Sequence, residues 1–343
     1  MLIDKLVNTV RALDLDLKDK IVLTEAASGA YVVTPVLAAL AGAKVFAYSR
    51  ASYYGSISEV FENTKNVYQD YGYDLDIEFI DTLTREVIEQ ADIITNSGHL
   101  RPLNREKLQY AKDNVVIPLM YEAWEWRDAD IDLAYTRERG FKIGATNERH
   151  IDVDVFNYLG DMAVKQIFDA GLCLYKNRFV LISNNDFGPY IAKVVSKMCK
   201  SLGVIDVEDN RHKYQYDNVD WISTFPDISI NDKYSDAEAI IFTAYPFDKP
   251  WIGEHTAIPA EKLKNAFKHP YILRYAGDLD CHSLRSHGIR FFPQIVSSGH
   301  MGVLPSAIGY DPIIRLQAGG LKVGEALISG NYDHNNYPLL EVI

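Results

Sequence analysis

Cysteine is scarce in this sequence, and the few cysteines that occur form no recognisable pattern. There are three among 343 residues, Cys173, Cys199 and Cys281. They are odd in number, far apart and without a Cys-x-x-Cys pair, which argues against a disulfide framework and against a zinc site. We therefore expect free thiols, no bound metal and a reducing, cytoplasmic compartment.

Basic residues are outnumbered by acidic ones. The chain has 35 Lys and Arg against 47 Asp and Glu, which gives a net charge of -12. Proteins that bind nucleic acid gain affinity from cationic side chains beside phosphates, so this balance has the wrong sign. We expect a small-molecule ligand and no nucleic-acid partner.

Long apolar runs are missing as well. The best candidate, residues 32–48, is interrupted by Pro35 and Lys44, so no segment reaches the roughly 18 uncharged residues of a membrane span. The opening Met-Leu-Ile-Asp-Lys lacks the basic and apolar segments of a secretory signal. We expect neither membrane insertion nor secretion.

Short apolar runs alternate with amphipathic stretches through the first part of the chain. The amphipathic stretches predict helices at residues 2–13, 30–41, 57–68, 84–89, 105–111 and 133–139. The apolar runs predict strands at residues 21–24, 44–48, 76–80, 92–95, 115–120 and 142–145. Such alternation is typical of a parallel sheet covered by helices on both faces.

A second series of the same kind follows a long helix predicted over residues 153–172. Its strands are expected at 178–183, 204–207, 239–243, 271–275 and 289–292, and its helices at 190–202 and 307–328. Residues 210–235 are polar, aromatic and aperiodic, which predicts a long loop insertion. A length about twice that of a usual domain agrees with two domains. The predicted fold class is α/β, with two doubly wound, Rossmann-like parallel-sheet domains joined by the long crossover helix.

From about residue 91 to residue 327 this order of elements resembles the D-2-hydroxyacid dehydrogenase superfamily. The matching stretches are residues 131–147, before the long helix, and Val296-Ser-Ser-Gly-His-Met-Gly302, before the last helix. The resemblance implies a substrate and catalytic domain of residues 1–150 with 307–343, and a nucleotide-binding domain of residues 151–306. It implies an oxidoreductase that uses NAD or NADP on a small polar, carboxylate-bearing metabolite in an interdomain cleft. We also expect a homodimer.

The turn after the strand at 178–183 departs from the Gly-x-Gly-x-x-Gly fingerprint of that family. It reads Ser183-Asn-Asn-Asp-Phe-Gly-Pro-Tyr190, in which only Gly188 fits. The expected cofactor-binding residues are Asn184, Asn185, Phe187 and Gly188 in this turn, with Glu208 and Asp209 placed to hold a ribose. The alternative is an ordinary turn at the edge of a sheet.

Two further places are candidates for binding or catalysis. Ser28 and Gly29, in the turn before the first domain's second helix, could hold an anion together with Arg50, although a capped helix explains the turn equally. His300 matches the family's catalytic histidine, or else caps the final helix. The family arginine falls at Ala276, so Arg274, on the same face of its strand, is the expected substitute, with Asp278 or Asp280 as the acid.

Two loops of the first domain are rich in polar groups and follow strands of the predicted sheet. We expect the carboxyl ends of parallel strands to hold the ligand. Glu122 and His99 could form an acid–base pair, and Arg101 could hold an anion. Substrate-binding roles are expected for Ser97, Gly98, Arg101, Tyr121 and Trp124, the two aromatic residues forming a wall. A third loop, residues 146–152, is explained as the cap of the long helix.

Two other functions fit the same sequence. A nucleotide- or metabolite-binding protein that lost hydride transfer is favoured by the missing glycines and the displaced arginine. A non-redox enzyme, such as a lyase or transferase, would use His99, Glu122 and His300. Fold alone does not decide between these functions.

Overall fold

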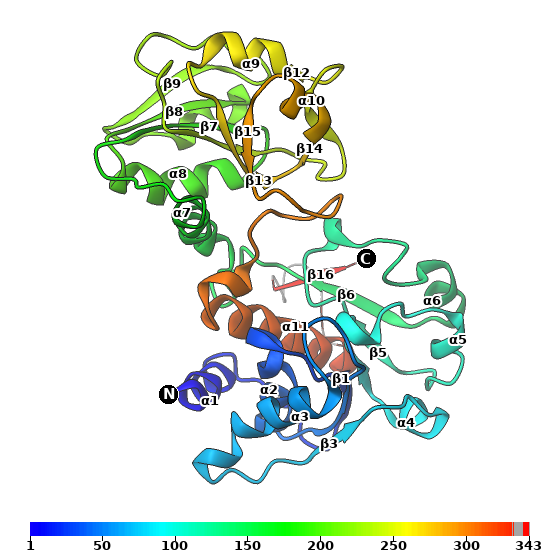
Figure 1. Cartoon of the computed structure of the whole chain (residues 1–343). Coiled ribbons are helices and arrows are strands. Elements are labelled where there is room, and N and C mark those ends of the chain that lie inside the picture. Colours follow the sequence, from blue (N-terminus) through cyan, green and yellow to red (C-terminus); the bar gives the residue numbers. More distant parts are fainter. Residues whose placement is uncertain (331, 333–338, 343) are drawn as a thin grey trace. The chain divides into compact units, whose positions relative to one another are not determined.

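The computed structural model describes residues 1–330, 332 and 339–342. The chain forms two compact units, residues 1–155 with 309–343 and residues 156–308, which Figure 1 shows in the colours of the sequence. Each unit is an α/β structure built on its own parallel sheet. Among the described residues, no helix combines the length and the apolar character needed to cross a membrane.

The first unit is built on a seven-stranded sheet in the order β16-β6-β5-β4-β1-β2-β3. The strands are β1 (Ile21–Glu25), β2 (Lys44–Tyr48), β3 (Ile77–Ile80), β4 (Ile93–Ile94), β5 (Val116–Pro118), β6 (Lys142–Thr146) and β16 (Leu340–Val342). All neighbours pair in parallel except β16, which is antiparallel to β6. That edge strand was not expected from the sequence.

Helices cover both faces of the first sheet (Figure 1). One face carries α1 (Leu2–Ala12), α2 (Val33–Leu40), α3 (Ile57–Asn66) and α11 (Asp311–Ser329). The other face carries α4 (Arg85–Gln90), α5 (Arg105–Leu108) and α6 (Leu133–Arg139). Helix α11 packs on β5, β6 and α2, within the first unit. Glycines allow this close approach: a Cβ at Gly320 would lie 2.5 Å from the Met120 sulfur.

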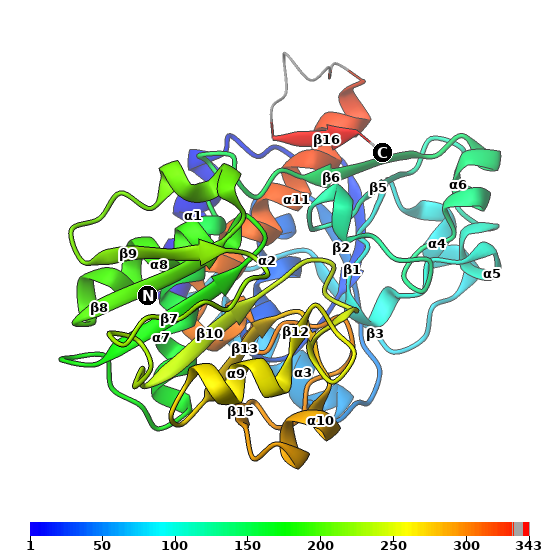
Figure 2. The ribbon, with the colours of Figure 1, turned by 90° about the horizontal axis from the view of Figure 1, so that it is seen from above.

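The second unit contains a six-stranded parallel sheet in the order β15-β13-β10-β7-β8-β9. Its strands are β7 (Arg178–Ser183), β8 (Ser201–Asp206), β9 (Val219–Thr224), β10 (Ala239–Thr243), β13 (Tyr271–Ala276) and β15 (Arg290–Phe292). One face packs on α7 (Leu159–Asp169) and α8 (Phe187–Met198), and the other on α9 (Ala260–Ala266) and α10 (Cys281–Ser286) (Figure 2). A separate small sheet joins β11 (Pro250–Gly253), β12 (Ile258–Pro259) and β14 (Asp278–Leu279).

Three sequence expectations for this unit are corrected. The predicted loop insertion of residues 210–235 contains β9, whose residues are half-buried and therefore show little alternation. The helix predicted at 190–202 is α8, which begins at Phe187 because Pro189 is tolerated in a first helical turn. The helix predicted at 153–172 is only α7, preceded by Asp154 in a left-handed conformation (φ 49°). Helix α7 belongs entirely to the second unit.

Candidate functional site at the carboxyl edge of the first sheet

Each sheet has one point at which the order of its strands reverses. In the first sheet this switch lies between β1 and β4, and in the second between β7 and β10. In open α/β sheets ligands bind beside the carboxyl ends of the strands at such a point. The residues that follow these four strands are therefore the first candidates for a site in either unit.

In the second unit the chain's own hydrogen bonds cross the switch point. The Asn184 side chain donates to the carbonyl of Tyr245 at 3.1 Å and accepts from the Tyr245 N–H at 2.8 Å. The Asn185 amide donates to the hydroxyl of Thr243 at 3.3 Å. The two residues expected to line a cofactor crevice thus tie the end of β7 to the end of β10.

The amino end of α8 is likewise occupied by side chains. Asn185 Oδ1 accepts the N–H of Phe187 at 3.0 Å, an N–H that would otherwise face a phosphate. Asp186 places a carboxylate there, paired with Lys213 at 3.2 Å. The Phe187 ring is directed into the core, with its centroid 5.5 Å from that of Phe156. This end of α8 is capped and negatively charged.

Gly188 has a packing role in the structure. A Cβ at this position would lie 2.3 Å from the hydroxyl of Tyr214 and 2.6 Å from that of Ser183. Tyr214 is held there by a hydrogen bond to Asp206, the buried last residue of β8. The third glycine of a fingerprint also serves close packing of helix against strand, so Gly188 alone does not distinguish the two roles.

The two acids expected to hold a ribose point to other partners or to solvent. Glu208 is exposed, and its oxygens accept hydrogen bonds from Arg211 and Thr224, each at 3.0 Å. Asp209 is exposed beside it. Together with the bridged switch point, these contacts count against a dinucleotide in the usual Rossmann position.

Replacing Gly188 by alanine should therefore destabilise the second unit whether or not a cofactor is present. We expect the free energy of unfolding to fall by about 1–3 kcal/mol, because the new methyl group must displace Tyr214 or Ser183. Urea denaturation measures this change. The control is Lys197→Ala on the exposed face of α8, and equal stability of the two variants would contradict the packing role.

Arg274 holds a loop in place. Its buried guanidinium pairs with Asp278 and points to the backbone carbonyls of Ser297 and His300, each at 3.4 Å. Asp278 also accepts the N–H of Gly299 at 3.2 Å. The Arg274–Asp278 pair thus orders the segment that carries His300. His300 itself is exposed.

The two remaining candidates near this loop are also placed by the structure. His300 does not cap the final helix, because α11 begins only at Asp311. Asp280 is the N-cap of α10 and accepts the N–H of Ser283 at 3.0 Å. Asp280 therefore has a structural role as a helix cap. His300 stays a candidate catalytic residue, because it is exposed and does not cap a helix.

In the first unit, Glu25 ends β1 at the switch point and is only 6% exposed. Its carboxylate lies against the backbone of Gly98, where a Cβ would be 2.1 Å from Oε2. The same oxygen accepts the N–H of His99 at 2.9 Å. Burial raises the pKa of Glu25, opposed by the His99 N–H and by the charge of Arg101. Glu25 is thus a buried carboxyl group with a raised pKa at the centre of the carboxyl edge.

The loop after β4 surrounds this acid with polar groups. The hydroxyl of Thr95 donates to that of Thr24 and is 2.8 Å from that of Ser97. His99 is half-buried, and burial together with the charge of Arg50 lowers the pKa of its imidazole. Of the expected substrate residues, Ser97 is buried in this hydroxyl chain and Gly98 lies exposed beside Glu25.

Arg101 and Tyr121 form one structural group with Asn96. The guanidinium donates to the Asn96 carbonyl at 2.8 Å and lies over the Tyr121 ring, 5.1 Å from its centroid. The Asn96 amide donates to the Tyr121 hydroxyl at 2.8 Å. Arg101 is also 3.7 Å from Asp130. We expected the Arg101 guanidinium to be available to an anion. Instead, much of its hydrogen-bonding capacity is used by Asn96 and Asp130.

Glu122 is fully buried and pairs with Arg149 rather than with His99, which corrects the expected acid–base pair. Its two oxygens accept from Arg149 Nη1 at 2.6 and 2.7 Å, and the indole N–H of Trp124 donates to the same carboxylate. The Trp124 ring is 37% exposed. Burial raises the pKa of Glu122, opposed by the bonds from Trp124 and Arg149.

Further acids that sequence analysis missed lie at the same edge. Burial, and then the charge of Glu122, raises the pKa of Glu125 to about 7. The pKa of Glu148, in the loop after β6, is raised by burial and by both of these carboxylates. Burial and the charges of Glu25 and Glu148 raise the pKa of Tyr31 to about 12. The charges of these groups therefore act on one another's pKa at this edge of the sheet.

The raised pKa of Glu125 predicts a pH-dependent contribution to stability. Between about pH 4.5 and 7 the folded chain retains a proton that the unfolded chain releases, so the free energy of unfolding falls as pH rises. The variant Glu125→Gln lacks this proton. We expect its stability relative to the wild type to increase from about pH 5 to about pH 8, as measured by thermal unfolding. The control is Glu62→Gln on the exposed face of α3, and parallel pH profiles of Glu125→Gln and wild type would contradict the assignment.

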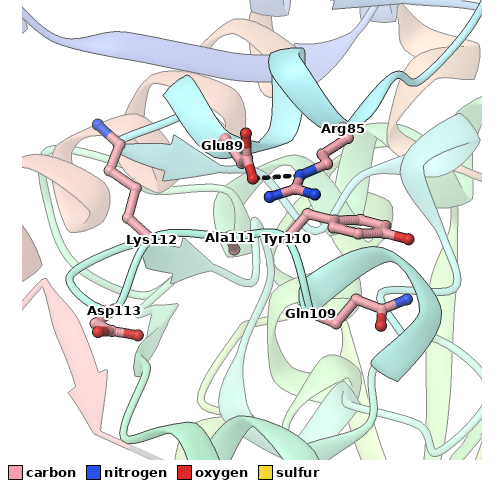
Figure 3. Close-up of a pocket in the computed structure, with 7 residues that line it drawn as sticks. All are labelled: Arg85, Glu89, Gln109, Tyr110, Ala111, Lys112 and Asp113. Carbon is pink, nitrogen blue, oxygen red and sulfur yellow. Dashed lines mark hydrogen bonds and ion pairs between the residues drawn. The ribbon is translucent and has the colours of Figure 1, made fainter.

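The first unit also has a surface depression, which lies away from this carboxyl edge. It is lined by Arg85, Glu89, Gln109, Tyr110, Ala111, Lys112 and Asp113 (Figure 3). Arg85 pairs with Glu89 at 2.5 Å, Lys112 with Asp92 at 2.5 Å, and Asp113 with Arg139 at 2.9 Å. Lys112 and Asp113 precede β5, so the depression is at the opposite, amino edge of the sheet. Within the described part of the chain, no group of three or more His, Cys, Asp or Glu side chains could hold a metal ion.

The two sheets and their strand orders give the chain a two-unit α/β fold. Solved structures that share it include a dipicolinate synthase chain from Bacillus halodurans, 11% identical, with a TM-score of 0.55 over 93% of this chain and 99% of that chain. The corresponding dipicolinate synthase chain from Bacillus subtilis is 11% identical, with a TM-score of 0.58 over 93% and 100%. The pyruvate reductase of Chlamydomonas reinhardtii is 10% identical, with a TM-score of 0.53 over 94% and 99%.

These likenesses confirm the predicted α/β fold class. No protein-family model matches the chain, and no curated protein matches it. At identities of 10–11% the shared fold carries no residue roles from one protein to another. Function must be argued from the site.

Proposed function

We propose that this chain is an enzyme that exchanges protons with a small, carboxylate-bearing metabolite at the carboxyl edge of its first sheet. One observation carries the proposal. Glu25 is a buried acid with a raised pKa, fixed at the switch point by the N–H of His99 and by contact with Gly98. A carboxyl group whose pKa is moved toward neutrality is suited to general acid–base catalysis.

The roles follow from the contacts. Glu25 transfers the proton, and His99, whose imidazole is kept neutral by burial and by Arg50, is the second group able to accept one. Tyr121 and Trp124 line the edge with aromatic surface, and Arg101 positions Tyr121 and Asn96. In this proposal no dinucleotide bound to the second unit takes part in the reaction, because side chains of the protein occupy the hydrogen-bonding groups of the turn after β7.

The names of the structural relatives agree with such a ligand. Dipicolinate and pyruvate, from which those proteins take their names, are both small carboxylates. One name describes a synthase and the other a reductase, so the shared fold serves more than one reaction. A carboxylate-bearing metabolite is the substrate class we propose for this chain.

An NAD- or NADP-dependent oxidoreductase is the second candidate. It is supported by the likeness in fold to the pyruvate reductase and by the location of His300 on a loop ordered by Arg274 and Asp278. The hydrogen bonds of Asn184 and Asn185 across the switch point count against it. A cytoplasmic homodimer stays a prediction under either function.

A conversion experiment separates the two candidates. A metabolite extract is treated with a nucleotide pyrophosphatase to destroy nicotinamide dinucleotides, incubated with the protein and compared by mass spectrometry with an untreated extract. We expect the same metabolites to be consumed in both extracts. Consumption that occurs only when NAD, NADP or their reduced forms are restored would establish the oxidoreductase instead.

A further inference from the structure

We propose that Arg50, His99 and Lys107 form a site for the oxyanion of the substrate, a carboxylate or a phosphate, beside Glu25. This inference rests on the proposed function, because it names the group by which that substrate is held. The three residues lie in different segments of the first unit, after β2, after β4 and on α5.

The sheet places two of these residues on either side of Glu25. Strand β1 pairs with β2 on one side and with β4 on the other. Glu25 pairs with Tyr48 at the end of β2, and Arg50 follows two residues later. His99 follows β4 and bonds Glu25 through its N–H. Arg50 and His99 therefore flank the end of the strand that carries the proposed proton donor.

Lys107 is connected to the same loop from α5. Its ammonium group donates to the carbonyl of Leu100 at 2.6 Å, one residue beyond His99. The side chain is half-buried, and burial and the charge of Arg50 lower its pKa, with Glu106 acting in the opposite direction. The Arg50 charge thus acts on both His99 and Lys107, so the two cationic groups and the imidazole share one electrostatic environment.

These positive charges are not neutralised by the protein. Across the residues that the structure describes, neither Arg50 nor Lys107 has a carboxylate within ion-pair distance, whereas most other basic groups of this unit do. Arg50 is also exposed. Burial raises the pKa of the nearby acid Glu25. Like charges that converge without a partner favour an anionic ligand.

The chemistry of the site agrees with its position. A guanidinium binds a carboxylate or phosphate through two parallel hydrogen bonds, and an ammonium adds a point charge. An oxyanion held by Arg50 and Lys107 fixes the rest of the substrate beside Glu25. Its charge also raises the pKa of the His99 imidazole, which becomes a better proton acceptor once substrate is bound.

The test is a titration of His99 followed by NMR, with inorganic phosphate and acetate as separate probes. The His99 signal is assigned from its loss in His99→Gln. We expect one or both anions to raise the imidazole pKa in a saturable manner, and the stronger probe tells phosphate from carboxylate. In Arg50→Ala the pKa should be higher without anion, and the response to anions should be lost. Arg137→Ala, at an exposed arginine of α6, removes the same charge and should behave as wild type.

Two results would overturn the inference. One is an imidazole pKa that neither anion changes, and the other is an anion response that persists in Arg50→Ala. In the conversion experiment Arg50→Ala should raise KM by roughly 10- to 100-fold, the loss of one charge-assisted contact. Conversion by Arg50→Ala with an unchanged KM contradicts the anion site and leaves the proposed function standing. Absence of conversion by wild type contradicts the proposed function, while the NMR titration still tests the anion site.

Discussion

Substituting Glu25 by glutamine should reduce metabolite conversion by about 10² to 10⁴, the usual contribution of general acid–base catalysis. Glutamine has nearly the same shape, and its oxygen can still accept the N–H of His99. What it lacks is a proton that titrates. We therefore expect kcat to fall while KM stays close to that of wild type, since the group is required in the transition state rather than for binding.

The matched control for this substitution is Glu62→Gln, which removes the same charge from an exposed position on α3. A circular dichroism melt of each variant establishes that both are folded. Conversion by Glu25→Gln at the wild-type rate would remove Glu25 from the reaction. A loss confined to KM would assign it to binding alone.

Replacing Arg274 by alanine should lower the free energy of unfolding of the second unit by about 3–5 kcal/mol. The reason is the buried carboxylate of Asp278, which would lose its cationic partner, while the carbonyls of Ser297 and His300 would lose a donor. Urea denaturation measures the effect, and Lys264→Ala on α9 is the exposed control. The resemblance to dehydrogenases implies instead a catalytic arginine, whose loss would spare the fold and stop turnover.

A double variant makes the comparison sharper. If the two residues act as one ion pair, Arg274→Ala with Asp278→Ala should cost less than the sum of the single substitutions. Additive costs would contradict the pairing. If Arg274→Ala is as stable as the wild type, the structural role is contradicted and Arg274 is again a candidate catalytic residue.

The alternating strands and helices could be predicted because most strands are short, apolar and buried in sheets covered on both faces. Strand β10, with every residue buried, is an example. Strand β9 could not, because it is at an edge and its residues are half-buried on both faces. The start of α7 was misplaced for another reason. Val153 and Val155 fit its helical period but pack into the core of the first unit.

The candidate site was predicted only in outline. The rule that ligands bind at the carboxyl ends of parallel strands identified the loops of His99 and Glu122 correctly as parts of one edge. The same rule applied to β1 would have found Glu25, a charged residue that ends an apolar strand. Its partner Gly98, however, is distant in the sequence, and no local pattern indicates that contact. Nor does any pattern indicate that Glu122 pairs with Arg149.

Gly188 shows how a partial motif can mislead. Its spacing from the strand fits the third glycine of a dinucleotide fingerprint, and on sequence alone a ligand would explain it. In the structure the absent Cβ leaves room for Tyr214, which is bound to the buried Asp206 at the end of the neighbouring strand. The third glycine of a fingerprint is itself a packing glycine, so Gly188 alone does not indicate a pyrophosphate.

A calorimetric titration of the wild-type protein with NADH and with NADPH determines whether the second unit binds a dinucleotide. The hydrogen bonds of Asn184 and Asn185 join the ends of β7 and β10, and we propose that the chain acts at the carboxyl edge of the first sheet without a dinucleotide. We predict no saturable heat with either compound. Micromolar binding of one of them that is abolished by Gly188→Val, while the fold is kept, would contradict the account.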